Sequence, residues 1–269
     1  MRAVHIPTYN AFIRCHETPS NGPVVVYLPA ISFSATASFF GVVTHPKTPD
    51  HCALLVDYLG SGMSDHPVNF DYSLDAHART IAALLDSAGC QKATVIGHSM
   101  GGTVAIKLAV LRPDLVGNLI VGEGNVTSGG GSLVKQIVGY EEAEFKDSVF
   151  PQMQAEMVEA AKRGDAVGSR RNNVWKGASA LGLYRNAHAL NGVQDTLLEE
   201  FLSLTIPRTF IYGKKSMPAT PEAAGPDTPW PDDLRAKGVR IEVVPNAGHG
   251  QMFDNLDGFV DVLVRTAFR

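Results

Sequence analysis

Short, almost uninterrupted apolar runs alternate along this chain with longer amphipathic segments. Apolar runs of this length are typical of strands buried on both faces, as in a parallel sheet that helices cover on each side. One amphipathic segment, residues 73 to 88, places apolar side chains at helical spacing from Leu74 to Leu85, which predicts a helix. The alternation predicts an α/β fold with a mostly parallel central sheet and helices on both faces. The runs that predict strands are 24–28, 52–56, 93–97, 118–122, 208–212 and 239–244.

The alternation stops between residues 122 and 208, an interval far longer than a simple crossover connection requires. The interval opens on a glycine-rich stretch, residues 127–132, and continues with amphipathic helical patterns. We interpret residues 125–205 as a helical cap inserted over the carboxyl edge of the sheet. Residues 1–124 and 206–269 then form the two parts of the core domain.

Composition and charge narrow the classes of partner. The 269 residues carry a net charge of −4 and the basic residues are scattered, so neither a nucleic acid nor a membrane surface is the expected partner. A small-molecule substrate suits this composition better. No apolar run approaches the roughly 18 residues of a membrane span, and the N-terminus lacks the apolar core of a signal peptide, so a cytoplasmic protein is expected. Cys15, Cys52 and Cys90 are too widely spaced for a disulfide framework or a metal site and are interpreted as inert thiols.

The stretch Gly97-His98-Ser99-Met100-Gly101 lies between a predicted strand and a strongly helical segment. A nucleophilic serine must stand clear of the sheet, and the tight turn that exposes it leaves no room for side chains two residues before and after it. The same turn puts Ser99 at a helix N-terminus, where the amide of Met100 points toward an oxygen that becomes negative during acyl transfer. We interpret Ser99 as a nucleophile, although a tight turn with a capping serine has the same pattern.

Serine is a weak nucleophile, so a histidine must reach it, and a carboxylate must fix the tautomer of that histidine. Among the nine histidines, His249 stands out because it follows the last predicted strand and precedes the C-terminal helical segment. That position puts it at the carboxyl edge of the sheet, where the serine turn also lies. His249 is therefore the predicted general base, and His98 is expected to pack beneath the turn.

Four blocks of the chain resemble the α/β-hydrolases, in particular the capped, esterase-like serine hydrolases. The blocks are VVVYLPAISFSA, LLVDYLGSGMSD, VIGHSMGG and VVPNAGHGQMFDNLDGF. Their order and spacing are more specific than any one of them, and the resemblance covers nearly the whole length. It implies catalysis by a serine, a histidine and an acid, with no metal and no organic cofactor. It also implies an oxyanion hole made by the backbone N–H groups of Ile31 and Met100, because Pro29 has no N–H to donate.

The acid departs from the pattern that many members of this family show. Their acid follows the strand that corresponds to residues 208–212, in a Tyr-Gly-x-x-Asp arrangement, whereas this chain reads Tyr212-Gly213-Lys214-Lys215-Ser216. A hydroxyl carries no charge and cannot stabilise an imidazolium as a carboxylate does. Some relatives place the acid at the end of the preceding strand, where this chain has Glu123, and Glu123 is the favoured acid. Asp227 and Asp232, in the loop that follows, are the alternatives.

These residues predict hydrolysis of an ester, thioester or lactone through an acyl-enzyme. Apolar residues in the cap region favour a small, largely hydrophobic substrate. Basic residues of the same region are interpreted as a solvated face, with an anionic substrate as the alternative. Three other functions stay open, namely hydrolysis of a carbon–carbon bond, acyl transfer to another alcohol, and ligand binding without catalysis. The basic residues are Lys162, Arg163, Arg170, Arg171, Lys176 and Arg185.

Overall fold

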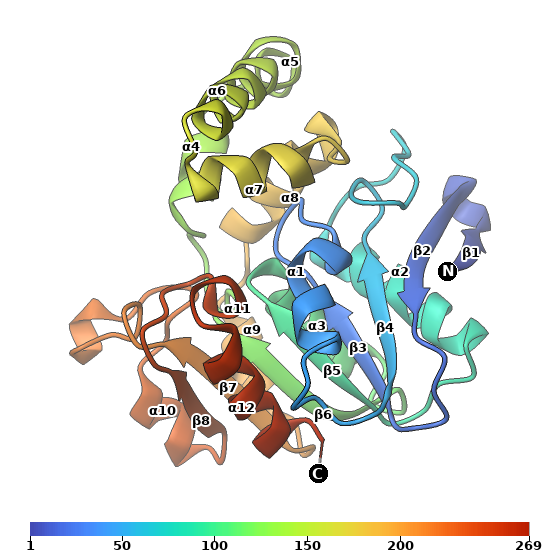
Figure 1. Cartoon of the computed structure of the whole chain (residues 1–269), viewed down its shortest axis with the longest axis vertical. Helices are drawn as coiled ribbons and strands as arrows, with labels where there is room; N and C mark the ends of the chain where they lie inside the picture. The colour runs from blue at the N-terminus through green and yellow to red at the C-terminus, as the bar shows by residue number, and fades with distance from the viewer. Residues whose placement is uncertain (269) are drawn as a thin grey trace.

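A central sheet of eight strands organises the computed structural model, which describes residues 1–268 (Figure 1). The strand order is β1-β2-β4-β3-β5-β6-β7-β8. β2 pairs antiparallel with β1 and with β4, and the other neighbouring strands are parallel. The predicted α/β fold with a mostly parallel sheet is confirmed. The strands are β1 (Arg2–Ile6), β2 (Ala11–Glu17), β3 (Val24–Leu28), β4 (Cys52–Asp57), β5 (Ala93–His98), β6 (Val116–Gly122), β7 (Arg208–Gly213) and β8 (Arg240–Val244).

Alternate residues of the strands belong to two hydrophobic cores, one on each face of the sheet. On β3, Val26 belongs to the core that contains α2 and α3, whereas Tyr27 belongs to the core that contains α1 and α12. Successive strand side chains point to opposite faces, so a strand that is apolar at every position must be covered on both sides. The first core takes in α2 (Leu74–Ser87), α3 (Met100–Leu111), α9 (Thr196–Ser203) and α10 (Pro231–Ala236), and the second α1 (Ala35–Val43), α11 (Gln251–Asp254) and α12 (Leu256–Thr266).

The helices between β6 and β7 form a separate group above the sheet (Figure 1). They face the carboxyl ends of β3 and β5, because Ile31 and Ser99 line one cavity together with Trp175 and Leu190. α9 also lies between β6 and β7 in the sequence, but it does not belong to this group, because it packs against α3 of the core. The division of the chain into core and cap at residues 125 and 205 stays a prediction. The helices of this group are α4 (Ser132–Ile137), α5 (Glu142–Glu144), the π-helical segment η2 (Phe145–Val149), α6 (Phe150–Lys162), α7 (Ala166–Trp175) and α8 (Ala180–Asn191).

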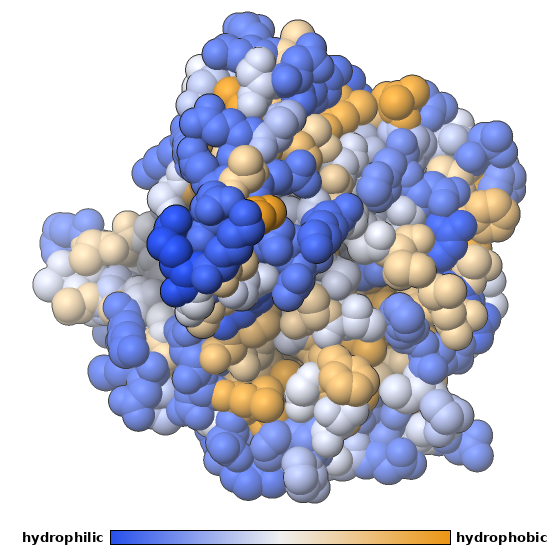
Figure 2. Space-filling view, turned by 45° about the horizontal axis from the view of Figure 1, so that its top comes forward, coloured by the Kyte–Doolittle hydropathy of each residue, from blue (hydrophilic) through white to orange (hydrophobic). Residues whose placement is uncertain are grey.

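The surface is mostly hydrophilic on the face drawn in Figure 2, where apolar residues form small, separate groups. Within residues 1–268, no helix combines the length and the apolar character that crossing a membrane requires. Cys15, Cys52 and Cys90 are all free. Burial raises the pKa of the Cys15 thiol to about 11, which keeps it protonated near neutral pH.

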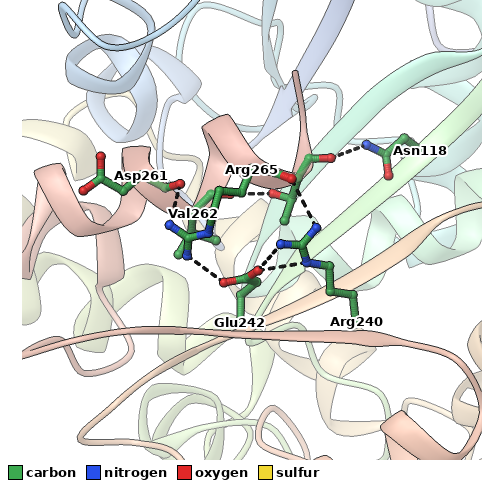
Figure 3. A network of polar contacts seen from close by, with 7 residues as sticks. Asn118, Arg240, Glu242, Asp261, Val262 and Arg265 are labelled. Carbon is green, nitrogen blue, oxygen red and sulfur yellow. Dashed lines mark hydrogen bonds and ion pairs between the residues drawn. The ribbon is translucent and has the colours of Figure 1, made fainter. Parts of the chain in front are cut away.

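A network of hydrogen bonds and ion pairs connects α12 to β6 and β8 (Figure 3). Glu242 accepts hydrogen bonds from Nε of Arg240 at 2.8 Å and from Nη2 of Arg265 at 2.7 Å. Arg240 also donates to the carbonyl oxygen of Arg265 at 3.2 Å, and Asn118 donates to that of Thr266 at 2.8 Å. Burial by itself would raise the pKa of Glu242, but the hydrogen bonds from Arg265 and Arg240 hold it below its usual value.

Replacing Glu242 by Gln is expected to lower the free energy of unfolding by about 1–2 kcal/mol near neutral pH, because a mostly buried acceptor loses its charge opposite two arginines. The difference in free energy of unfolding between wild type and variant should shrink as the pH falls through the lowered pKa of Glu242, because the wild-type carboxylate then becomes protonated. Denaturant unfolding at neutral and at acidic pH measures both effects. Glu159→Gln, which removes an exposed ion pair with Lys162, is the control, and equal losses from the two variants would contradict the prediction.

Candidate active site

Ser99 lies in a strained turn between β5 and α3. Its backbone has φ 55° and ψ −125°, outside the regions that L-residues favour. Two glycines make the turn sterically feasible, because a Cβ on Gly97 would meet the backbone of Gly101 and a Cβ on Gly101 would meet the carbonyl of Leu28. The N–H of Ser99 donates to the carbonyl oxygen of Gly122 at 2.8 Å, which ties the turn to β6. The turn therefore presents the Ser99 side chain at the carboxyl end of the sheet.

Two backbone N–H groups beside Ser99 have no acceptor among residues 1–268. Met100 is the first residue of α3, so its N–H has no partner within the helix, and the N–H of Ile31 is also free of any hydrogen bond. Ile31 and Ser99 line the same cavity. Free N–H groups at a helix N-terminus favour an oxygen that carries negative charge. Of the two residues that the resemblance implies for an oxyanion hole, Ile31 lines this cavity, and Met100 directly follows Ser99, which also lines it.

Glu123 is fully buried directly after β6, with its backbone at φ 45°. One carboxylate oxygen, Oε2, lies 2.8 Å from Nδ1 of His249. The other, Oε1, accepts from the N–H of Gly213 at 2.7 Å and from the hydroxyl of Ser216. Burial would raise the pKa of Glu123, but the hydrogen bond and charge of His249, with the bonds from Ser216 and Gly213, hold it below its usual value. Ser216, at the position where many relatives have the acid, here supports Glu123 as a donor.

The contact with Glu123 fixes the tautomer of His249. A carboxylate accepts only, so Nδ1 of His249 carries the proton and Nε2 is left to accept one. Burial alone would lower the pKa of His249, but the hydrogen bond and charge of Glu123 and the charge of Asp227 raise it above its usual value. Within residues 1–268 no hydrogen bond joins Nε2 to Ser99, although both residues line the same cavity. Catalytic contacts of this kind are often long before substrate binds.

Asp227 is a second carboxylate close to His249. Its Oδ2 lies 3.5 Å from Nδ1 of His249, farther away than Oε2 of Glu123, and burial raises its pKa. Asp232, the other alternative acid, is exposed and pairs with Arg235 at 2.6 Å. The candidate ligand atoms of Glu123, Asp227 and His249 lie within 4.8 Å of one another, but Nδ1 already donates to Glu123 and a cation bound there would displace that proton.

His98 supports the loop that carries His249. Its Nε2 donates to the carbonyl oxygen of His249 at 2.7 Å, which leaves Nδ1 unprotonated and buried without a partner among residues 1–268. Burial and the neighbouring charge of His249 lower the pKa of His98 to about 4. The ring is therefore neutral near pH 7 and holds the backbone of His249.

A cavity of about 340 Å³ lies between this site and the helices above it. Most of its lining is apolar, but Asn125 and Trp175 add buried polar groups that the sequence patterns do not single out. Only the position of Asn125, two residues after Glu123 at the same strand end, could have drawn attention to it. The lining residues are Ala30, Ile31, Phe33, His98, Ser99, Asn125, Gly131, Ser132, Leu133, Val134, Val167, Arg170, Arg171, Trp175, Leu190, Asp227, His249, Gly250, Phe253 and Asp254.

Comparison with known proteins gives matches at the level of family and of fold. A family model described as the alpha/beta hydrolase fold matches residues 23–256. The putative carbamate hydrolase RutD of Pseudomonas savastanoi pv. phaseolicola is 41% identical over 69 residues, which are 26% of this chain. This chain spans 27% of the length of RutD, so the match concerns one segment.

Two solved structures superpose on almost the whole chain. An esterase from Exiguobacterium antarcticum has a TM-score of 0.77 at 20% identity and covers 98% of this chain and 97% of its own. An enol-lactonase from Burkholderia xenovorans has a TM-score of 0.75 at 15% identity and covers 98% of both chains. At these identities, the likeness concerns the fold.

Proposed function

Because the chain belongs to the alpha/beta hydrolase fold family, we propose that it is a serine hydrolase that cleaves an ester, thioester or lactone of a small molecule through an acyl-enzyme. The observation that carries this proposal is the 2.8 Å contact between Glu123 and Nδ1 of His249 at the cavity that Ser99 lines. Among residues 1–268, this histidine is the one cationic partner of Glu123. Burying a carboxylate costs free energy, and stabilising an imidazolium during proton transfer accounts for its presence here. Residues 125–205 act as the cap in this proposal.

The first half of the proposed reaction transfers the acyl group to the enzyme. Oγ of Ser99 attacks the carbonyl carbon while its proton moves to Nε2 of His249, and Glu123 stabilises the resulting imidazolium. The N–H groups of Ile31 and Met100 bind the oxyanion, and losing one such donor typically costs about a hundred- to a thousandfold in rate. The bond to the leaving oxygen or sulfur then breaks as His249 returns the proton to it.

The second half transfers the acyl group to water. A water molecule gives a proton to Nε2 of His249 and its oxygen attacks the acyl carbon. The bond to Oγ of Ser99 breaks, the serine recovers the proton, and the carboxylic acid leaves. No step requires a metal ion or an organic cofactor.

Labelling with a serine-directed fluorophosphonate tests the activated serine directly. We expect intact-mass spectrometry to find one adduct on the wild-type protein and none on Ser99→Ala. Ser132→Ala is the matched control, because Ser132 lines the same cavity and belongs to no proton-transfer chain in the proposal. An unlabelled wild-type protein, or an adduct that survives in Ser99→Ala, would contradict the proposed function.

A further inference from the structure

Two residues that line the cavity carry buried hydrogen-bond donors that the proposed acyl chemistry does not use. Nδ2 of Asn125 and Nε1 of Trp175 have no partner among residues 1–268, although Asn125 is only 3% exposed and Trp175 only 1%. Neither N–H group can act as an acceptor, so each requires an oxygen or another acceptor opposite it. Buried polar groups in folded proteins are nearly always satisfied. Asn125 and Trp175 both line the cavity, and their donors lack an acceptor among the described residues, which points to a ligand with acceptor atoms.

Two arginines of α7 line the same cavity. Arg170 and Arg171 have no carboxylate within ion-pair distance among the described residues, whereas Arg185 of the cap pairs with Glu142 at 3.0 Å. The guanidinium carbon of Arg170 lies 4.0 Å from the ring centroid of Phe253, a stacking contact that positions the planar group. The basic residues of the cap thus differ, and two of them are placed at the cavity with their charge uncompensated.

We propose that the substrate carries a carboxylate, bound by Arg170 and Arg171 with support from the N–H groups of Asn125 and Trp175. This inference rests on the proposed function, because it assigns the substrate class of the same site. Guanidinium groups match a carboxylate well, since two parallel N–H groups meet its two oxygens.

A carboxylate suits this cavity better than a doubly charged phosphate. Asp227 and Asp254 line the same cavity, and their negative charge opposes a dianion more strongly than a monoanion. The apolar lining residues, such as Leu133 and Val134, suit a short hydrocarbon segment between the carboxylate and the scissile bond. The substrate class is therefore an ester, thioester or lactone whose short chain also carries a carboxylate.

A matched pair of esters tests the proposal by turnover. The 4-nitrophenyl monoester of adipic acid carries the carboxylate, and 4-nitrophenyl heptanoate replaces it by an alkyl end. We expect wild-type kcat/KM to favour the anionic ester by about tenfold or more, and Arg170→Gln and Arg171→Gln each to reduce this ratio by about tenfold, mainly through KM. Trp175→Phe, which removes the N–H and keeps an aromatic ring, should reduce the ratio severalfold.

The control for these variants is Arg163→Gln, which removes an exposed basic residue outside the cavity. It is expected to leave the ratio unchanged, and thermal unfolding verifies that every variant is folded. A wild-type enzyme that hydrolyses both esters equally well, or arginine variants that keep the wild-type ratio, would overturn the carboxylate proposal while the hydrolase proposal stands.

A binding measurement separates this proposal from the proposed function. Isothermal titration of Ser99→Ala with monomethyl adipate is expected to detect binding that weakens about tenfold when Arg170→Gln is added. Binding of this kind without turnover by the wild-type protein would support the anion site and overturn the hydrolase. Absence of binding to Ser99→Ala, with the fold intact, would overturn the anion site.

Discussion

Ser99→Ala is expected to lower kcat by about 10⁴-fold or more for any ester that the wild-type protein hydrolyses, because no other group in the proposed mechanism forms the acyl-enzyme. The residual rate should come from the oxyanion donors, which still polarise the carbonyl group. The expected change is in kcat with little change in KM, since the hydroxyl contributes more to the reaction than to substrate binding. Steady-state kinetics on the anionic 4-nitrophenyl ester measures this loss.

The stability of Ser99→Ala should remain close to that of the wild-type protein. The strained φ of 55° is kept in the variant, because alanine and serine carry the same Cβ, and the Ser99 side chain caps no helix. A thermal unfolding midpoint that matches wild type would attribute the loss of rate to the missing hydroxyl. A variant that retains more than about a hundredth of wild-type kcat would exclude Ser99 as the nucleophile.

The sequence predicts the six strands from β3 to β8, because each apolar run that predicts a strand forms one. β3 to β7 are buried along most of their length, whereas the edge strand β8 is mostly half-buried. β1 and β2 are not predicted, because polar side chains such as Arg14 and His16 interrupt the apolar pattern on a pair of antiparallel strands at the sheet edge. Such strands have one face in contact with solvent, so their composition resembles that of a loop.

The serine turn could be predicted from a short stretch because its requirements are local. The positions around Ser99 are crowded by backbone within a few residues, and only glycine fits at Gly97 and Gly101. The identity of the acid depends instead on a contact between distant parts of the chain, because Glu123 and His249 are 126 residues apart in the sequence. The path of the loop that carries Asp227 depends on contacts such as the bond from the N–H of Val126 to the carbonyl oxygen of Pro226 at 2.8 Å. No local pattern specifies such contacts.

The unpartnered donors of Asn125 and Trp175 cannot be recognised from the sequence either. Asn125 and Trp175 come from a strand end and from the end of α7, and an unsatisfied buried donor is recognised only when its surroundings are known. Among the basic residues between β6 and β7, sequence does not distinguish Arg170 from Arg163. The structure separates them, since Arg170 lines the cavity, whereas Arg163 is exposed and lies outside it.

Glu123→Gln should lower kcat by roughly 10³- to 10⁴-fold, because an amide removes the charge that stabilises the imidazolium and no longer enforces the required tautomer. The variant should also alter the pH profile of kcat/KM. Glu123 raises the pKa of His249 in the wild-type protein, so removing its charge lowers that pKa and moves the acidic limb of the profile to lower pH. Kinetics as a function of pH measures both the loss of rate and the shift.

Asp227→Asn is the matched control, because Asp227 is the other carboxylate near Nδ1 of His249 and lies at 3.5 Å instead of 2.8 Å. Its charge also raises the pKa of His249, so this variant should move the acidic limb in the same direction but lower kcat by only about tenfold or less. If Asp227 partly replaces the acid in Glu123→Gln, the double variant should lose more than the product of the two single losses. A larger loss from Asp227→Asn than from Glu123→Gln would reverse the assignment and make Asp227 the acid of the triad.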